Sequence, residues 1–383
     1  MVRLIHLYSG IGGLSLGAVR AGFQLAISID NDPNLAEIHK TNFPNSTHLN
    51  EDVSTLTASE LIKKACLEEG ELFGIAGGSP CQGFSRIGKR DLSDERNKLF
   101  TKLFELVAGS KPTFFLAENV EGILDEQNAE LVNSALALVR SSYRVLEPFV
   151  MNAADFGAPT NRKRVFFFGY MEDQFHDIDL EDFENAKWEK QTFVEEALGG
   201  LPKKLRDTWS DDENAWRKLR KRNYGDYWER IYGLIPEGVG DPETIRRLQE
   251  EHLVSGCTFT NHTEEVRTRF QTLEQGKTDS ISRMPRLKRH GLCPTLRAGT
   301  GKDKGSFQAL RPIHYSEPRV IMPREAARLQ GFPDWFRFHK TKWHTFRGIG
   351  NSVSPLIAEA LFEVIYGKMK SKTAEDTTIE SAN

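Results

Sequence analysis

The residue most clearly suited to a chemical role is Cys81, which stands in the sequence Gly-Gly-Ser-Pro-Cys-Gln at the end of an apolar run at 72–77. A thiolate is a strong nucleophile, and main-chain amides in a loop or at a helix start can lower the pKa of the thiol. A lone cysteine is usually inert, but a loop of glycine and proline is not typical of core packing. The zinc-deaminase pattern P-C-x-x-C is absent, because position 84 is Phe84. The sequence therefore indicates a nucleophilic cysteine.

A second reactive group, Glu118, closes the next apolar run together with Asn119 in the sequence TFFLAENV. The carboxyl ends of neighbouring parallel strands meet at one edge of a sheet, so Glu118 and the Cys81 loop are expected to face one pocket. A partly buried carboxyl can stay protonated at neutral pH and donate that proton. The alternative is that the Glu-Asn pair only caps a helix.

A glycine-rich turn is the third chemical feature. Gly10, Gly12 and Gly13 follow an apolar run and precede a helical pattern. Glycine permits positive φ and lets a ligand approach the main chain closely. Asp30 lies twenty residues after Gly10, at the end of the next apolar run, where an acidic side chain can accept hydrogen bonds from ribose hydroxyls. A tight turn without a ligand is the simpler alternative.

The glycine pattern departs from the dinucleotide-binding fingerprint. Its third glycine would fall at position 15, which is Ser15. A ligand with a ribose but no pyrophosphate fits this turn better, and an adenosyl sulfonium is such a ligand. Asp52, after a third short strand, is placed to hold the adenine amino group.

Strand and helix signals alternate over the first 170 residues. The expected strands are Leu4–Tyr8, Gln24–Ile29, Leu72–Gly77, Thr113–Ala117, Arg144–Val150 and Arg164–Tyr170. Helical patterns lie between them, at 14–21, 34–41, 58–69, 96–109 and 127–140. This alternation predicts an α/β fold with a doubly wound parallel sheet, in which ligands bind at the carboxyl ends of the strands.

The pattern changes after about residue 172. Residues 172–315 are polar and show no regular strand–helix repeat, which predicts a second, smaller domain or a large insertion. Apolar periodicity returns at 323–367 and ends in an expected helix, Pro355–Tyr366. Residues 368–383 are polar and charged, and we expect them to be disordered.

Composition sets broader bounds. The net charge of −3 argues neither for nor against nucleic acid, but basic residues gather at 217–222 and 283–304. Such clusters can follow phosphates, with a solvated surface as the alternative. The four cysteines are too widely spaced for a zinc site or a disulfide framework, so no metal is expected. We see no membrane span and no signal peptide, and we expect a cytoplasmic protein.

Several of these stretches occur together in one known family. HLYSGIGGL, GGSPCQGFS, AENV, NRKRVFFFGY, PREAARLQGFP and GNSVSP resemble, in this order, motifs of the bacterial-type DNA (cytosine-5) methyltransferases. The matches cover roughly 1–170 and 319–366. The resemblance implies the doubly wound fold of S-adenosylmethionine-dependent methyltransferases with a smaller target-recognition domain.

The resemblance assigns catalytic roles by position. Cys81 matches the nucleophile that attacks carbon 6 of cytosine, and Glu118 matches the residue that protonates or hydrogen-bonds N3. Arg162 and Arg164 match the arginine pair that flanks the base, with Arg164 on its O2 and on Glu118. Thiolate addition with N3 protonated makes carbon 5 nucleophilic enough to accept a methyl group. The target base must be flipped out of the duplex for this chemistry.

The resemblance also implies S-adenosyl-L-methionine as cofactor. The positions that match its contacts are Tyr8, Ser9, Gly10, Gly12, Gly13, Asp30, Asn31, Asp52, Val53, Leu99, Asn351 and Ser352.

Double-stranded DNA is the partner that the resemblance implies. The Gln82–Asn97 stretch matches the mobile loop that closes over DNA, and Thr295–Leu296 corresponds to the family's Thr-Leu pair. The expected DNA contacts are Ser85, Arg86, Lys89, Thr295 and Arg297.

The implied domain organisation follows the motifs. Residues 1–174 form a catalytic and cofactor-binding domain, and 175–343 form the target-recognition domain and hinge, with the family motif 319–335 at the hinge. Residues 344–367 complete the catalytic domain. We expect a monomer that modifies DNA in a restriction-modification system, with a cognate restriction endonuclease acting on the same site without direct contact.

The chain departs from the family pattern at four positions. His6 stands where the family usually has Asp, and Tyr8 where it has Phe. Thr160 stands where Gln is usual, and Ser79 where Phe precedes the Pro-Cys pair. None of these departures touches Cys81 or Glu118.

Three other functions compete with this interpretation. An RNA (transfer RNA) cytosine-5 methyltransferase has the same fold, but those relatives have a shorter variable region. A catalytically inactive DNA-binding relative is disfavoured by the intact Pro80–Cys81 and Glu118–Asn119 pairs. A nucleotide-dependent oxidoreductase is disfavoured by Ser15 and by the Pro-Cys-Gln loop.

Overall fold

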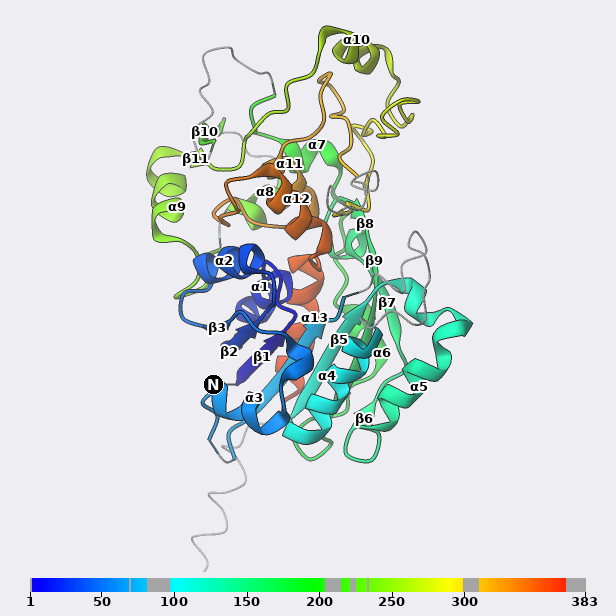
Figure 1. The fold of residues 1–383 in the computed structure, drawn as a ribbon. Coiled ribbons are helices and arrows are strands. Elements are labelled where there is room, and N and C mark those ends of the chain that lie inside the picture. Colours follow the sequence, from blue (N-terminus) through cyan, green and yellow to red (C-terminus); the bar gives the residue numbers. More distant parts are fainter. Residues whose placement is uncertain are drawn as a thin grey trace, which may run out of the picture.

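A computed structural model describes residues 2–68, 70–80, 97–203, 215–220, 225–232, 234–298 and 310–369. A central sheet with its helices forms one part of the molecule, and a region of helices and long loops lies beyond one edge of the sheet (Figure 1). The expected nucleophile Cys81 and the expected DNA contacts Ser85, Arg86 and Lys89 lie outside the described residues, as does the tail from residue 370.

The central sheet has the strand order β3-β2-β1-β4-β5-β9-β6, with β7 also paired to β9. Its strands are β1 (Arg3–Leu7), β2 (Gln24–Ile29), β3 (Thr47–Leu49), β4 (Phe73–Gly78), β5 (Phe114–Asn119), β6 (Arg144–Val145), β7 (Phe149–Asn152) and β9 (Lys163–Tyr170). Strands β1 to β5 are parallel. The winding reverses between β1 and β4, which is where ligands bind in sheets of this type.

The sequence prediction of a parallel sheet is wrong at the end of the sheet that contains β9. Strand β9 runs antiparallel to β5, β6 and β7, so the sheet is not parallel throughout. Residues 153–162 connect β7 to β9, and a parallel crossover needs a longer connection. The expected strand Arg144–Val150 is also divided into β6 and β7. Pro148, which has no N–H to donate to a neighbouring strand, lies in the interruption.

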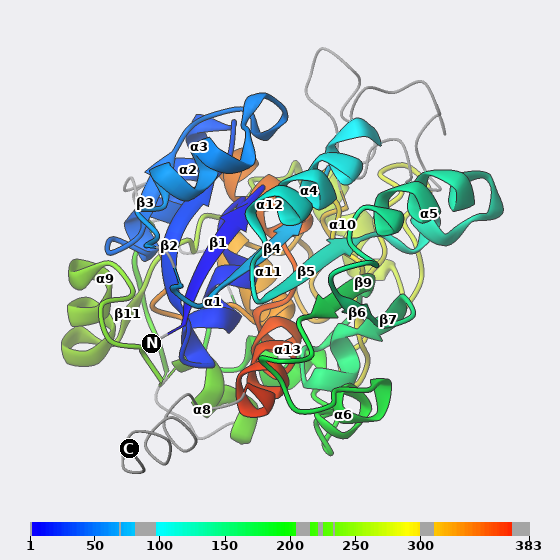
Figure 2. The same cartoon turned by 90° about the horizontal axis from the view of Figure 1, so that it is seen from below.

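Helices cover both faces of the sheet. Phe114 and Leu116 of β5 belong to the apolar layer under α1 (Gly13–Arg20) and α13 (Pro355–Lys368). Phe115 and Ala117 alternate with them and belong to the opposite layer, under α3 (Ala58–Lys64), α4 (Asn97–Ser110) and α5 (Ala129–Ala137). Figure 2 shows α4 on one face and α1 with α13 on the other. Every residue of β5 is therefore buried, which explains its continuous apolar pattern.

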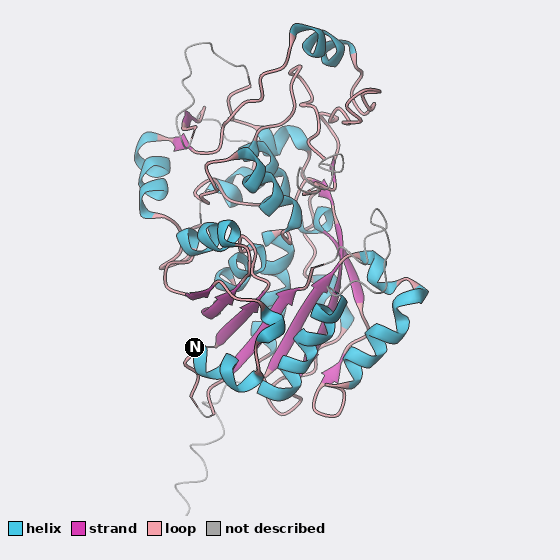
Figure 3. Ribbon diagram, in the orientation of Figure 1, coloured by secondary structure: helices cyan, strands magenta, loops and turns pink. Residues whose placement is uncertain are grey.

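The region beyond the sheet contains little regular strand (Figure 3). Its elements are α7 (Val194–Leu198), β10 (Arg217–Lys218), α8 (Asp226–Tyr232), α9 (Pro242–Arg246), β11 (Leu253–Val254), α10 (Glu264–Thr272), β12 (Cys293–Pro294), α11 (Pro323–Gln330) and α12 (Lys342–Asn351). Helix α2 (Pro33–Asn42) and the short strand β8 (Thr160–Asn161) border it from the sheet side. Helix α6 (Leu180–Asn185) lies instead beside the sheet, where Phe183 stacks on Phe149 of β7.

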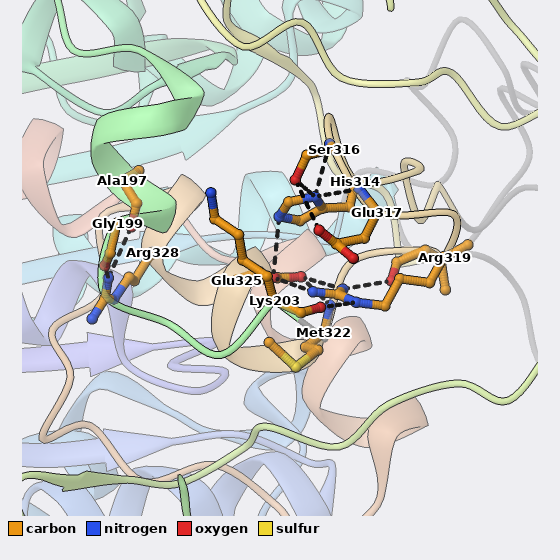
Figure 4. Close-up of polar contacts among 11 residues, drawn as sticks. Ala197, Gly199, Lys203, His314, Ser316, Glu317, Arg319, Met322, Glu325 and Arg328 are labelled. Atoms are coloured by element: carbon orange, nitrogen blue, oxygen red, sulfur yellow. Dashed lines mark hydrogen bonds and ion pairs between the residues drawn. The ribbon is translucent and has the colours of Figure 1, made fainter. Parts of the chain in front are cut away.

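Buried arginines stabilise this loop-rich region. On α11, Arg328 donates hydrogen bonds to the carbonyl oxygens of Ala197 and Gly199 (Figure 4). It also pairs with Asp334. Arg319 pairs with Glu325 through two hydrogen bonds, of 2.7 and 2.8 Å. Because these side chains bind main-chain carbonyl groups that no strand partner reaches, they replace the hydrogen bonds that a sheet would supply.

Helix lengths differ modestly from the sequence prediction. The expected helix 58–69 ends at Lys64, since Cys66 has a left-handed φ of 50° that α-helix does not allow. Helix α13 begins at Pro355 as expected and continues to Lys368. Among the described residues, no helix is both long and apolar enough to cross a membrane.

Candidate active site

Glu118 and Arg164 form an ion pair at the carboxyl edge of the sheet. Glu118 lies near the end of β5 and Arg164 near the start of the antiparallel β9, and Arg164 Nε lies 2.8 Å from Glu118 Oε1. Both side chains are nearly buried, at 8% and 11% exposure. Burial raises the pKa of the Glu118 carboxyl, although the charges of Arg164 and Arg162 oppose that shift. The site therefore favours a carboxyl that can hold a proton and release it to a neighbouring atom.

The loop that leads to Cys81 starts beside this carboxyl. Gly78, the last residue of β4, is in register with Glu118, and a Cβ at Gly78 would lie 2.5 Å from Glu118 Oε2. Asn119 Nδ2 donates a hydrogen bond to Ser79 Oγ at 3.1 Å. Glycine at position 78 thus leaves room for the Glu118 carboxyl, and Asn119 holds the start of the loop against β5. Cys81 follows two residues later, outside the described part of the chain.

Arg162 has a different environment from Arg164. Its side chain is fully buried, and its guanidinium donates to the carbonyl oxygens of Leu296 at 3.2 Å and Gly350 at 2.9 Å. These contacts join β8–β9 to two distant parts of the chain. The role of Arg162 beside the base stays a prediction, and its geometry indicates that it holds the walls of the site.

The segment around Thr295 lies against the same edge. Cys293 and Pro294 form β12, which pairs with β8, and Thr295 Oγ1 donates to the carbonyl oxygen of Asn161 at 2.6 Å. A Cβ at Gly350 would lie 2.6 Å from the main-chain nitrogen of Ala298, so the chain next to Arg297 also passes close to α12. Thr295, which is expected to contact DNA, is therefore next to the predicted base pocket.

The glycine-rich turn follows the end of β1, at the same edge of the sheet as Glu118. Asp30 accepts a hydrogen bond from the Gly10 N–H and another from the Asp32 N–H, both at 2.8 Å. Burial raises the pKa of the Asp30 carboxyl, although these two hydrogen bonds oppose the shift. Asp30 does not cap α2, because the N-cap of that helix is Asp32.

Close packing explains why two positions of the turn are glycine. It also shows which distant segment of the chain contacts the turn. Gly12 has a φ of 97°, and a Cβ there would lie 2.3 Å from the Phe43 ring. A Cβ at Gly13 would lie 2.1 Å from Ser352 Oγ. By contrast, a Cβ at Gly10 would meet no atom within 4 Å, so space remains open beside the turn. Ser352 thus lies next to the turn although it is far from it in sequence.

The remaining expected cofactor residues border this corner. Tyr8 has a φ of 54°, and its hydroxyl donates to the Leu99 carbonyl oxygen at 2.9 Å. Burial raises the pKa of Tyr8, and the negative charge of Asp52 adds to that shift. Asp52 is exposed and accepts a hydrogen bond from the Ser54 N–H. Ser9 and Val53 are buried, whereas Asn31 is exposed.

A row of hydrogen-bonded histidines lies next to the glycine-rich turn, and the sequence analysis did not predict it. His6 Nδ1 bonds Ser15 Oγ, Ser15 Oγ lies 2.8 Å from His39 Nε2, and His39 Nδ1 lies 2.9 Å from His48 Nε2. Burial lowers the pKa of His6 to about 3, so this imidazole is neutral at pH 7. The available signal was His6 itself, a polar residue inside an apolar strand where the family usually has Asp.

Comparison with known proteins identifies the family. Residues 2–367 match the C-5 cytosine-specific DNA methylases, which is nearly the whole chain. The chain belongs to the C-5 cytosine-specific DNA methylase family. This membership makes it a DNA cytosine-5 methyltransferase and confirms the family and the enzyme class expected from the motifs. The family implies a reaction that depends on S-adenosylmethionine.

Individual members of the DNA methylase family are similar over most of the chain. The type II methyltransferase M.XorII of Xanthomonas oryzae pv. oryzae is 39% identical, over 96% of this chain and 85% of that protein. The type II methyltransferase M.DdeI of Desulfomicrobium norvegicum is 30% identical, over 95% of this chain and 88% of that protein.

Solved structures agree with the expected fold. A protein described as a candidate DNA modification methyltransferase from an E. coli prophage has a TM-score of 0.84 and 44% identity, over 96% of this chain and 99% of that one. The Dnmt2 methyltransferase of S. pombe has a TM-score of 0.60 at 16% identity, over 96% and 99% of the two chains, which shows the fold alone. The methyltransferase fold predicted from sequence is confirmed.

Proposed function

We propose that this DNA methylase transfers a methyl group from S-adenosyl-L-methionine to carbon 5 of a flipped-out cytosine in a specific duplex sequence. The observation that carries the proposal is the buried Glu118–Arg164 pair beside the start of the Cys81 loop. An acid for N3 and the loop of the nucleophile thus share one strand edge, and a glycine-rich turn lies at the neighbouring strand β1.

The reaction assigns one task to each residue. The Cys81 thiolate forms a bond to carbon 6, while Glu118 supplies the proton that N3 gains, so that carbon 5 becomes nucleophilic. S-adenosylmethionine, when bound, supplies an electrophilic methyl group. After carbon 5 has been methylated, its proton passes to a base such as a water molecule and Cys81 leaves as thiolate, which restores the aromatic ring, and N3 returns its proton to the Glu118 carboxylate. Arg164 keeps the Glu118 carboxyl in place and is positioned to donate to O2 of the base.

The residues at the end of β1 fit an adenosyl ligand. Asp30 retains lone pairs for the ribose hydroxyls after accepting two main-chain hydrogen bonds, and the space beside Gly10 is open. Asp52 is exposed, and its carboxylate is suited to the adenine amino group. Ser352 and Leu99 close the sides of the same corner.

Recognition of the duplex is assigned to residues 175–318. Side chains that reach base edges in the major groove specify sequence. The position of Thr295 and Arg297 beside β8 supports a role at the junction of DNA and base pocket. The packing of α13 against α1 supports the proposal that 344–367 complete a catalytic domain formed by 1–174.

The biological setting is inferred from relatives. Since M.XorII and M.DdeI are named type II methyltransferases, we infer that this protein protects DNA in a restriction-modification system. A restriction endonuclease would then act on the same site without touching the methylase, which works as a monomer.

Transfer of tritium from labelled S-adenosylmethionine tests the proposal. Label should enter duplex DNA that contains the target sequence and should not enter transfer RNA. Label in transfer RNA alone would replace the proposal with the RNA methyltransferase alternative, and label in neither would favour an inactive relative.

A further inference from the structure

Helix α12 meets the glycine-rich turn at Arg347 and Gly348. A Cβ at Gly348 would clash with the Ile11 side chain, so the backbone of α12 lies directly against the turn. Helix α12 also packs against α2, the helix that follows Asp30, and Figure 1 shows the two next to each other. Arg347 thus reaches the proposed cofactor corner from a segment 315 positions beyond Asp32 in the chain.

Arg347 binds the carboxylate that begins α2. Its Nη1 pairs with Asp32 Oδ2, and its guanidinium lies 5.3 Å from the centre of the Trp343 ring, one helical turn earlier on α12. The other carboxylate oxygen, Asp32 Oδ1, accepts the N–H groups of Asn34 and Leu35 and so caps α2. The two oxygens of Asp32 therefore have separate partners, one in α2 and one in α12.

Asp32 is also the neighbour of the expected ribose ligand. Its main-chain N–H donates to Asp30 Oδ1, while the Gly10 N–H donates to Asp30 Oδ2, both at 2.8 Å. Two carboxylates therefore meet within three residues at the start of α2. A like charge this close disfavours ionisation, and the ionised carboxylate is the form that accepts hydrogen bonds from both ribose hydroxyls.

Arg347 offsets the repulsion between these two carboxylates. Burial raises the pKa of the Asp30 carboxyl and the charge of Asp32 adds to the rise, whereas two main-chain hydrogen bonds and the charge of Arg347 lower it. From the segment after β3, the neutral Asn50 side chain binds the main-chain carbonyl oxygen of Asp30. The positive charge that favours the ionised Asp30 thus comes from α12.

The exposure of the Arg347–Asp32 pair indicates that stability is not its main role. The two side chains are 30% and 14% exposed. Ion pairs that are this open to solvent contribute little to the free energy of unfolding. Removing the Arg347 charge is therefore expected to leave the fold intact, and its effect should appear at Asp30.

We propose that Arg347 is a positioning residue for the cofactor, acting through Asp32 to keep the Asp30 carboxylate available to the ribose of S-adenosylmethionine. By neutralising Asp32, Arg347 leaves Asp30 as the ionised acceptor, which main-chain donors have already oriented. This role does not require Arg347 to touch the ligand. The inference rests on the proposed function, because it requires Asp30 to bind the ribose.

The pH dependence of cofactor binding tests this role. In calorimetric titrations, Arg347→Gln should weaken S-adenosylmethionine binding by about three- to tenfold near pH 6 and by less near pH 8. Without Arg347 the pKa of Asp30 is higher, so the ionised acceptor is lost earlier as pH falls. The KM for S-adenosylmethionine should rise while kcat at saturating cofactor stays within about twofold. Arg347→Lys should restore the wild-type profile.

The chain offers a matched ion pair as control. Arg337 pairs with Asp241, which caps α9 as Asp32 caps α2, and the two side chains are 36% and 16% exposed. Arg337→Gln removes an ion pair of the same kind without a second carboxylate that binds ribose. It should therefore bind S-adenosylmethionine as the wild type does at every pH.

Asp32→Asn separates the charge of Asp32 from its role in α2. Asparagine caps helices about as well as aspartate, so this change removes the charge and keeps the cap. Combined with Arg347→Gln, it should return the pH profile to that of the wild type. If the double variant binds as weakly as Arg347→Gln, or if Arg347→Gln binds like the wild type at every pH, Arg347 has no positioning role. Normal cofactor binding by Asp30→Ala would instead overturn the ribose contact of the proposed function, and the role of Arg347 with it.

Discussion

Arg162 donates a hydrogen bond from its buried guanidinium to the carbonyl oxygen of Leu296, 134 positions further along the chain. This bond joins the end of the central sheet to the recognition region at Leu296, the neighbour of the expected DNA contact Thr295. A second bond from Arg162 to Gly350 adds the segment that borders the glycine-rich turn. The Arg162 side chain thus fixes the relative positions of three chain segments at the proposed site.

The Arg162–Leu296 contact defines how recognition can be transplanted. Replacing residues 175–292 with the equivalent segment of a relative of known specificity should transfer that specificity, since the graft ends before β12 and preserves the contact. Digestion of methylated plasmid by restriction endonucleases measures the outcome. A folded, active chimaera that keeps the original target would assign sequence reading to another part of the chain.

Cys81 should form a covalent bond to the target base. Duplex DNA with 5-fluorocytosine at the target should give an adduct that survives denaturing electrophoresis, because fluorine cannot leave carbon 5 as a proton does. Cys81→Ala should give no adduct and no methylation, while Cys66→Ala, at an exposed cysteine, should behave as wild type. Methylation by the Cys81→Ala protein would refute the covalent mechanism.

Glu118→Gln keeps the shape of the side chain but removes the proton donor. Turnover should fall by roughly 10²–10⁴-fold, with a small effect on cofactor affinity. Since burial raises the pKa of Glu118, wild-type turnover should be highest while this carboxyl is protonated and should decline as pH rises beyond that pKa. Glu121→Gln, three positions along, serves as control. Equal pH profiles for the wild type and Glu118→Gln would reduce Glu118 to a structural residue.

Asp30→Ala should weaken S-adenosylmethionine binding by about 1.5–3 kcal/mol, roughly ten- to a hundredfold, because ribose donors lose a charged acceptor. Asp30→Glu should lose less, and DNA affinity without cofactor should barely change. Asp32→Ala is the matched control, since it removes the cap of α2 and should cost about 1 kcal/mol of stability. Calorimetric titration with S-adenosylmethionine separates the loss of a cofactor contact in Asp30→Ala from the loss of stability in Asp32→Ala. Cofactor affinity within twofold of wild type in Asp30→Ala would contradict the ribose contact.

The buried His6 should make folding sensitive to acid. The unfolded chain protonates this imidazole near pH 6.5, whereas in the folded protein burial lowers its pKa to about 3. The unfolded state therefore binds more protons between these values, and the free energy of unfolding falls as pH decreases, by up to about 1.4 kcal/mol per pH unit. Urea denaturation at several pH values should show a shallower slope for His6→Asn. His176→Asn, at an exposed histidine, should retain the wild-type slope.

The sequence by itself determined the chemistry and the frame that carries it. Strand–helix alternation and the positions of Gly10, Asp30, Cys81 and Glu118 predicted a doubly wound sheet with reactive groups at its carboxyl edge. The motif order predicted the family. The fold and the family are confirmed, and both were predictable because strand ends and turn residues obey local rules of spacing and backbone conformation.

Tertiary structure decided the relations between distant residues. The antiparallel β9 brings Arg164 to Glu118, and no local pattern states the direction in which a strand inserts. The sequence predicted Arg162 only as a base contact, and the structure adds that its guanidinium donates to the carbonyl oxygens of Leu296 and Gly350. The row of hydrogen bonds that links His6, Ser15, His39 and His48 forms only because β1, α1, α2 and β3 pack together. Such contacts depend on how whole elements meet in space, which the spacing of residues along one element does not encode.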